Sequence, residues 1–262
     1  DFMKKFLTMA GVTAAAAILS GCCFNQVQYD PNAEPVVVKQ SAGKISIDGK
    51  INEKAWQSAA VYDLKFYDGF ELPPLEKARV LAEPFSPGQV RLLYSKDYVY
   101  VAAKFTDKDI IGLAPHSQMR LHLHGDILEL FFHPENAMHF WEFHAAPNGR
   151  CAVFYYLTGD MASVTELTGT TRLPGGMKCA ATVDGKINDH KADDKAWTVE
   201  MQIPRKIFAE AGTPFAPGKA WRVRLGRWNA SHNLYAVQKS YFPEQPYNRS
   251  LQRQYFAPLV IK

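Results

Sequence analysis

Gly125-Asp126-Ile127-Leu128-Glu129-Leu130-Phe131-Phe132 packs strand-forming residues tightly and yet carries two carboxylates. Its residues are mostly strand formers. Because side chains in a strand alternate between two faces, the even-numbered residues share one side and the odd-numbered residues share the other. After Asp126 the even-numbered side is apolar, as expected of a strand that faces a core. The odd-numbered side is apolar except for Glu129. A carboxylate on a second apolar face indicates a role beyond core packing.

The next run of strand-forming residues, His139 to Ala146, repeats this two-sided pattern. A short Pro-containing turn separates the two runs, which therefore predict neighbouring strands. In the second run Trp141 and Phe143 share one side, whereas Glu142 and His144 share the other. A face that combines aromatic rings with a few polar groups is typical of a ligand groove.

The composition favours one large β-rich domain. The chain has 262 residues, of which 47% are hydrophobic and 13% aromatic, enough to bury a substantial core. Its 16 prolines and 17 glycines suit many short strands separated by turns better than a bundle of helices. The net charge is +4 and the basic residues are scattered, so the pattern does not indicate nucleic-acid binding.

The first residues have the layout of a secretory signal. Met3-Lys4-Lys5 precedes an apolar run over residues 6–19, which leads into Leu19-Ser20-Gly21-Cys22. This ending resembles the lipobox of bacterial lipoproteins, and the resemblance implies a signal peptide over residues 1–21. We therefore expect an exported lipoprotein of the bacterial cell envelope, anchored to a membrane through a lipid on Cys22. The alternative is a transmembrane helix, but the apolar run is shorter than the roughly 20 residues that a span requires.

Residues 22–43 are largely polar and without periodicity, which predicts a tether between the lipid anchor and the folded part. The folded domain is expected to span residues 44–262 without an internal break. Within it, residues 66–88 are rich in proline and acidic residues and predict a long surface loop. Further alternating patterns predict strands over residues 89–94, 98–105, 151–157, 177–183, 197–203, 221–229 and 255–261, with a short helix that begins at Pro204 and ends at Gly212.

Two tryptophans are expected to lie in the core. Trp197 begins a strictly alternating strand in which Trp197 and Met201 face inward and Glu200 faces outward. Asn52 can cap a brief helix that contains Trp56, and we expect Trp56 to fill a gap in the core.

Four segments carry a family resemblance over nearly the whole predicted domain. They are Ile45–Trp56 (ISIDGKINEKAW), Val99–Ala102 (VYVA), Gly125–Phe131 (GDILELF) and Trp197–Pro204 (WTVEMQIP). Their order resembles that of the family 9 carbohydrate-binding modules and their relatives. The resemblance implies an all-β fold, a sandwich of two antiparallel sheets with one or two short helices. It also implies non-catalytic carbohydrate binding in support of polysaccharide or oligosaccharide breakdown and uptake, beside an enzyme that the sequence does not identify.

The sequence departs from the family at the sugar-clamping positions. Well-known members hold the sugar between two tryptophans, and those places here hold Leu123 or His124 and Ser250 or Leu251. The polar residues that match the sugar-contacting pattern still favour a site on the two central strands. The predicted ligand-binding residues are Glu129, Glu142, His144, Arg224, Trp228 and Tyr247, with Phe140 as a further aromatic candidate.

Other functions are compatible with the same residues. Glu129 and Glu142 could serve as the acid and base of a glycoside hydrolase, which uses two carboxyl groups about 5–10 Å apart. Glu129 could instead form an ion pair with Arg224 and have only a structural role. His122 and His124, two apart on an expected strand, are weak candidates for zinc ligands.

Cofactor binding is a further alternative. Relatives of the DOMON type bind haem, and Met138, His139, His144 and Met201 are potential axial ligands, although Met201 fits a core position better. No cofactor is expected from the pattern as a whole, with calcium and haem as the alternatives.

Cys151 and Cys179 lie on predicted strands of a domain that is expected to be exported. Oxidising conditions outside the cytoplasm permit a disulfide between them. Two buried free thiols are an equal alternative, and the sequence does not distinguish the two.

Overall fold

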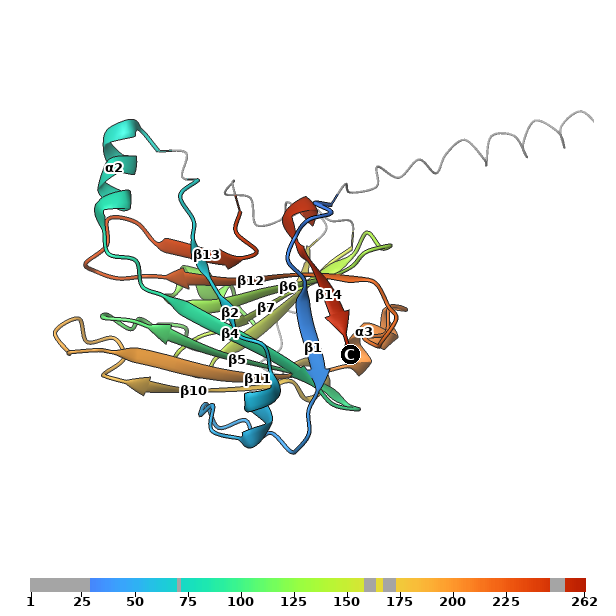
Figure 1. Ribbon diagram of the computed structural model, residues 1–262. Coiled ribbons are helices and arrows are strands. Elements are labelled where there is room, and N and C mark those ends of the chain that lie inside the picture. Colours follow the sequence, from blue (N-terminus) through green and yellow to red (C-terminus); the bar gives the residue numbers. More distant parts are fainter. Residues whose placement is uncertain (1–28, 70–71, 158–163, 167–172, 246–252) are drawn as a thin grey trace, which may run out of the picture.

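The structure is a computed structural model that describes residues 29–69, 72–157, 164–166, 173–245 and 253–262. The described part of the chain is mainly β, with two short α-helices, α2 (Pro74–Ala82) and α3 (Lys206–Glu210) (Figure 1). The 3₁₀ segments are η1 (Lys54–Ser58), η2 (Leu121–Leu123), η4 (Pro174–Gly176) and η5 (Arg253–Tyr255). The strands are β1 (Val36–Gln40), β2 (Tyr62–Asp63), β3 (Lys65–Phe66), β4 (Gly88–Tyr94), β5 (Tyr98–Thr106), β6 (Ile127–Pro134), β7 (Phe140–Ala145), β8 (Cys151–Tyr156), β9 (Val164–Glu166), β10 (Lys178–Asp184), β11 (Ala196–Pro204), β12 (Trp221–Asn229), β13 (Gln238–Phe242) and β14 (Ala257–Ile261).

The strands follow one hydrogen-bonded path, in the order β10-β11-β5-β4-β1-β14-β12-β6-β7-β8-β9. We call β10, β11, β5 and β4 the first half of the sheet, and β14, β12, β6, β7, β8 and β9 the second half. Neighbours within each half are antiparallel. β1 pairs in parallel with β14 and with β4, and so joins the halves. The expected two separate sheets are therefore one nearly closed sheet around a shared core (Figure 1).

β1 lies inside the segment that the sequence assigned to a tether. Val36 and Val38 are fully buried and alternate with half-buried Val37, as in any strand that faces a core. The apolar run is only three valines long, and both neighbouring strands come from distant parts of the chain. Local periodicity therefore could not identify it, and the folded domain begins before residue 44.

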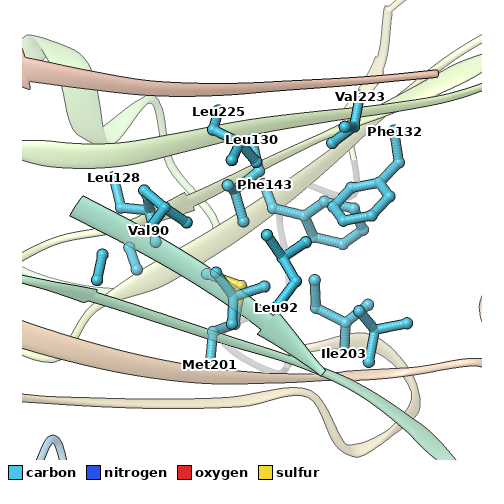
Figure 2. Packing of buried hydrophobic residues seen from close by; sticks show 14 of the residues in the cluster. Val90, Leu92, Leu128, Leu130, Phe132, Phe143, Met201, Ile203, Val223 and Leu225 are labelled. Atoms are coloured by element: carbon cyan, nitrogen blue, oxygen red, sulfur yellow. The ribbon is translucent and has the colours of Figure 1, made fainter. Parts of the chain in front are cut away.

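The expected two-sided character of β6 is confirmed. Leu128, Leu130 and Phe132 face the interior, where fully burying a side chain of this kind contributes about 1.5–3 kcal/mol. Ile127 and Phe131 belong to a separate buried cluster on the outer face. The interior side chains of β6 pack against the first half of the sheet, represented by Val90, Leu92, Met201 and Ile203 (Figure 2).

The alternation of β11 predicted that Glu200 faces solvent, but Glu200 is buried. Trp56 is buried, as expected, and its indole N–H donates to Glu200 Oε1 at 2.9 Å. The backbone N–H groups of Asp48 and Gly49 donate to Glu200 Oε2 at 3.2 and 3.1 Å. Gly49 has a φ of +83°, and a Cβ there would lie 2.6 Å from the Ala181 carbonyl carbon. The turn at Asp48 and Gly49 therefore covers β11 at Glu200.

Further elements, α2 and β13 among them, were not expected from the sequence. Residues 66–88, predicted to be a loop, contain α2, which begins at a proline in its first turn and projects from the sheet (Figure 1). β13 pairs with β12 and with the short strand β3. In the described ranges no helix is long and apolar enough to cross a membrane. The helix predicted after Pro204 is confirmed as α3.

Cys151 and Cys179 face each other across the opening of the sheet. β8 lies near one end of the strand path and β10 lies at the other, yet Cys179 lies beside Cys151, and its Sγ donates to the Gly149 carbonyl oxygen at 3.1 Å. Both are free thiols in this structure. The hydrogen bond with Cys151, together with burial, raises the pKa of Cys179 well above its usual range.

We expect mild oxidation to convert this contact into a disulfide. Thiol–disulfide exchange with oxidised glutathione would join Cys151 to Cys179 and release two equivalents of reduced glutathione. The chain-entropy model predicts a gain of about 3.5 kcal/mol in the free energy of unfolding for a loop of this length. Thiol counting under denaturing conditions before and after oxidation measures the bond, and urea unfolding measures the gain. If Cys151 and Cys179 both stay reduced after prolonged oxidation, the prediction of a disulfide is wrong.

Candidate functional site

The candidate site lies on the outer face of β6, β7 and β12. Glu129 on β6 is directly opposite His144 on β7 and opposite Gly226 on β12. Since side chains two residues apart on a strand share a face, Glu142 and Arg224 point to the same side. All four side chains, Glu129, Glu142, His144 and Arg224, are buried. The structure therefore brings together the four polar residues that the sequence singled out.

Four contacts organise these residues. Arg224 Nη2 lies 2.5 Å from Glu129 Oε2, which forms a buried ion pair. His144 Nε2 lies 2.7 Å from Glu142 Oε1 and 3.9 Å from Glu129 Oε1. The Tyr156 hydroxyl donates a short hydrogen bond to Glu142 Oε2. The imidazole of His144 thus stands between the two carboxylates, and we call Glu129, Glu142 and His144 the Glu–His–Glu group.

The two carboxylates have different electrostatic surroundings. Burial raises the pKa of Glu129, and Arg224 opposes this effect only in part. Burial also acts to raise the pKa of Glu142, but His144 and the hydrogen bonds from His144 and Tyr156 outweigh it and lower the pKa. Burial raises the pKa of Tyr156 beyond its usual range. Glu142 is therefore the carboxylate that these surroundings hold ionised.

Aromatic rings enclose the guanidinium of Arg224. Its central carbon lies 4.2 Å from the ring centroid of Tyr241 and 4.5 Å from that of Phe131. Rings at these distances stabilise a buried cation through their negatively charged faces. Gly226 makes room for this arrangement, because a Cβ there would lie 2.9 Å from the ring of Tyr241.

Trp228 lies at the edge of the site, on the same face of β12 as Arg224. Its ring contacts His122, with 4.9 Å between centroids, and the Lys239 ammonium lies 3.9 Å from its centroid. His122 in turn packs edge-on against His144 at 5.5 Å. Burial and the nearby His144 lower the pKa of His122 to about 4. A neutral His122 therefore connects the tryptophan to the Glu–His–Glu group.

Several buried polar atoms beside this group have no hydrogen-bond partner within the part of the chain that the structure describes. Native proteins leave few such atoms, because each one costs about 1–3 kcal/mol unless water or a ligand satisfies it. Their concentration here indicates that a polar ligand or ordered water belongs at this face. The atoms are His122 Nδ1, His144 Nδ1, Trp228 Nε1, Tyr241 Oη and Gln245 Nε2.

The pair of zinc ligands that the sequence predicted on one strand is not formed. His122 lies in η2 and His124 directly follows it, so the two residues are not on a strand and do not share a strand face. Groups of three possible metal ligands do occur among the described residues. They are Glu129, Glu142 and His144, and on the first half of the sheet Asp48, Glu53 and Glu200.

The possible haem ligands do not converge. Met201 is fully buried in the interior cluster, as its core interpretation required. His144 lies on the outer face of the second half, whereas Met138 is exposed in the turn before β7. His139 stacks against Trp141 and Tyr155. The other predicted residues, Tyr247 and Cys22, lie outside the described residues.

Four residues of the site were not predicted from the sequence. Tyr156 could have been found, because alternation along the predicted strand 151–157 places it on one face with Phe154. Tyr241 and Lys239 belong to β13, which was not predicted, and Gln245 follows that strand. Gln245 Oε1 accepts a hydrogen bond from Arg224 at 3.3 Å, a contact that no local pattern reveals.

Comparison with known proteins shows the fold but not a family. No protein-family model and no curated protein matches the sequence. A candidate carbohydrate-binding protein from Bacteroides uniformis is similar in structure, with a TM-score of 0.68 and 14% identity over 87% of this chain and 99% of that chain. A family 9 carbohydrate-binding module from Caldicellulosiruptor kristjanssonii, solved with cellotriose, has a TM-score of 0.53 and 14% identity over 87% and 94% of the two chains. The chain therefore shares the fold of these proteins, as the sequence resemblance implied.

We expect Glu129→Gln to destabilise the protein strongly. The substitution keeps the shape of the side chain but leaves the buried guanidinium of Arg224 without its counter-ion, which typically costs about 3–5 kcal/mol. Urea unfolding followed by tryptophan fluorescence measures the change.

Glu135→Gln is the matched control. Glu135 pairs with Arg222 at 3.1 Å but is about one-third exposed, so its loss should cost about 1 kcal/mol or less. If the two variants lose the same small amount of stability, the Arg224–Glu129 pair does not hold this face together.

Proposed function

We propose that the chain binds carbohydrate without catalysis at the outer face of β6, β7 and β12. The observation that carries this proposal is the set of buried polar atoms beside aromatic rings that have no hydrogen-bond partner among the described residues. A sugar suits such a place, because each hydroxyl group can both donate and accept a hydrogen bond, while the C–H face of the ring packs on an aromatic side chain.

The residues of the site would make three kinds of contact with a sugar. Glu142 and Glu129 supply acceptors for hydroxyl groups, and Gln245 Nε2 and Trp228 Nε1 supply donors. Trp228 is the aromatic platform at the edge of the site. Lys239 covers part of that ring through a flexible side chain, so a sugar that packs on Trp228 would displace it. Trp228 alone would then pack against the sugar ring, which two tryptophans hold in the well-known family members.

The geometry favours binding over hydrolysis. A glycosidase places its two carboxyl groups on opposite sides of the scissile bond, with space for the sugar between them. Here one imidazole lies between the nearest oxygens of Glu129 and Glu142, and Arg224 holds the far side of Glu129. A side chain of the protein therefore fills the space between the two carboxyl groups, where a hydrolase would hold the scissile bond.

Cello-oligosaccharides are the first ligands to test, because the structurally similar module was solved with cellotriose. We expect the full-length chain to bind an oligosaccharide in a glycan array and Trp228→Ala to weaken calorimetric affinity about tenfold or more. Truncating a central aromatic side chain typically costs over about 1 kcal/mol, and tenfold corresponds to 1.4 kcal/mol.

Tyr98→Ala is the control, since Tyr98 is a half-buried aromatic residue on β5, in the other half of the sheet. Its affinity should equal that of the parent. Parent-like affinity in Trp228→Ala, or an equal loss in both variants, would place the carbohydrate elsewhere.

We also propose that the protein is a lipoprotein of the cell envelope, supported by the Leu19-Ser20-Gly21-Cys22 ending of its apolar leader. Several acyl chains at about 0.8 kcal/mol per buried methylene group anchor a protein firmly, whereas one chain does not. Cys22→Ala should therefore move the protein from the membrane fraction to the soluble fraction. Cys23→Ala, one residue further on, should remain with the membranes, and retention of Cys22→Ala after a carbonate wash would refute the lipid anchor.

A further inference from the structure

Three possible metal ligands converge on one point of the outer face. Glu129, Glu142 and His144 each offer one ligand atom, and these three atoms all lie within 4.8 Å of one another. The nitrogen is 2.7 Å from the Glu142 oxygen and 3.9 Å from the Glu129 oxygen. Ligand atoms on a tetrahedral zinc ion, with bonds of about 2.0–2.2 Å, lie roughly 3.4 Å apart. The two observed distances bracket this value, so small side-chain movements bring all three atoms to bonding distance of one ion.

The second oxygen of each carboxylate is held by another residue. Arg224 binds Glu129 Oε2, and the Tyr156 hydroxyl donates to Glu142 Oε2. These contacts leave the Oε1 atom of each carboxylate turned toward the imidazole. Metal sites commonly use such outer contacts to fix the orientation of their ligands.

Within the described ranges Glu142 has no partner with a permanent positive charge. Among the residues that the structure describes, His144 is its ion-pair partner, and an imidazole is uncharged unless it binds a proton. A buried carboxylate requires a compensating charge. A divalent ion bound by the Glu–His–Glu group would supply that charge.

The neighbouring side chains point to a further polar group at the same place. The nitrogens Trp228 Nε1 and His122 Nδ1 are buried and have no hydrogen-bond partner among the described residues. The His122 ring packs against His144. Tyr241 and Gln245, both nearly fully buried, also carry unpartnered atoms. Three protein ligands leave a fourth position on a tetrahedral ion, which water or a ligand hydroxyl group fills.

We propose that Glu129, Glu142 and His144 bind a divalent transition-metal ion, with zinc as the representative. The imidazole ligand disfavours calcium, which takes six to eight oxygen ligands, and suits zinc and its neighbours. The proposal stands on these ligand atoms and does not depend on carbohydrate binding.

Calorimetric titration of ZnCl₂ into the full-length chain, freed of metal by chelator dialysis and kept without carbohydrate, tests the site. We expect one tight zinc ion per chain and a rise in melting temperature on binding. His144→Gln should abolish that ion. Tyr156→Phe keeps the fold and all three ligands but removes one orienting contact, so zinc affinity should fall about 10–100-fold.

Two controls separate this site from other zinc contacts. His190 and His232 stack at 5.3 Å near the surface and could capture zinc, so His232→Ala should keep the tight ion. Asp48→Asn alters the other carboxylate group and should also keep it.

The proposal is overturned if the parent binds no zinc tightly, if His232→Ala loses the ion, or if Tyr156→Phe binds zinc as tightly as the parent. Should His144→Gln not fold, Tyr156→Phe decides the question. Repeating the oligosaccharide titration with and without zinc keeps the two functions apart: zinc binding without carbohydrate binding contradicts only the proposed function, and the reverse contradicts only the metal site.

Discussion

The buried ion pair between Arg224 and Glu129 is the interaction on which the outer face depends. Removing two charges from water costs several kcal/mol for each ion, and only close geometry with further contacts recovers that cost. The register between β6 and β12 supplies the geometry, because it places Glu129 opposite a glycine that leaves space for the ring of Tyr241. The guanidinium then lies between aromatic rings and the carboxylate. The polar character of this face therefore follows from strand register and from one small residue.

A second arginine of β12 makes a useful comparison. Arg227 points to the opposite side of the strand, where it pairs with Asp107 at 2.7 Å and donates to the backbone carbonyls of Ser86 and Thr106. Its partners come from the first half of the sheet and the loop that precedes it, so it links the two halves from within. Arg224 faces outward among rings and the Glu–His–Glu group. One strand thus carries a cation that connects the sheet internally and another that shapes a polar surface site.

Alternation along single strands allowed most of the fold to be predicted. The two faces of β6 and the inward positions of β11 follow from a period of two, which tertiary context did not alter. β1 could not be predicted, since its stability comes from pairing with β4 and β14, far away in the sequence. The position of Glu200 was missed for a related reason. Alternation says which face a side chain occupies but not whether another segment, here the turn at Gly49, covers that face.

The same distinction applies to the candidate site. That Glu142 and His144 share a face, and that Glu129 and Arg224 meet, follows from alternation and opposite charge. Which oxygen meets which nitrogen depends on the register between strands, and Tyr156 and Tyr241 enter only through that register. His122 was expected on a strand with His124, but the segment forms a 3₁₀ turn, which directs the ring toward Trp228.

The double pairing of β1 has a consequence for shortened forms of the protein. A fragment that starts at residue 44 lacks β1, so the strand edges of β4 and β14 that pair with it would both be open. Open edges present rows of unpaired N–H and C=O groups, to which strands of other molecules add readily. Such a fragment would lose the joint between its halves and gain two surfaces for self-association. β1 therefore covers one strand edge in each half, β14 through its valines and β4 through Lys39 and Gln40.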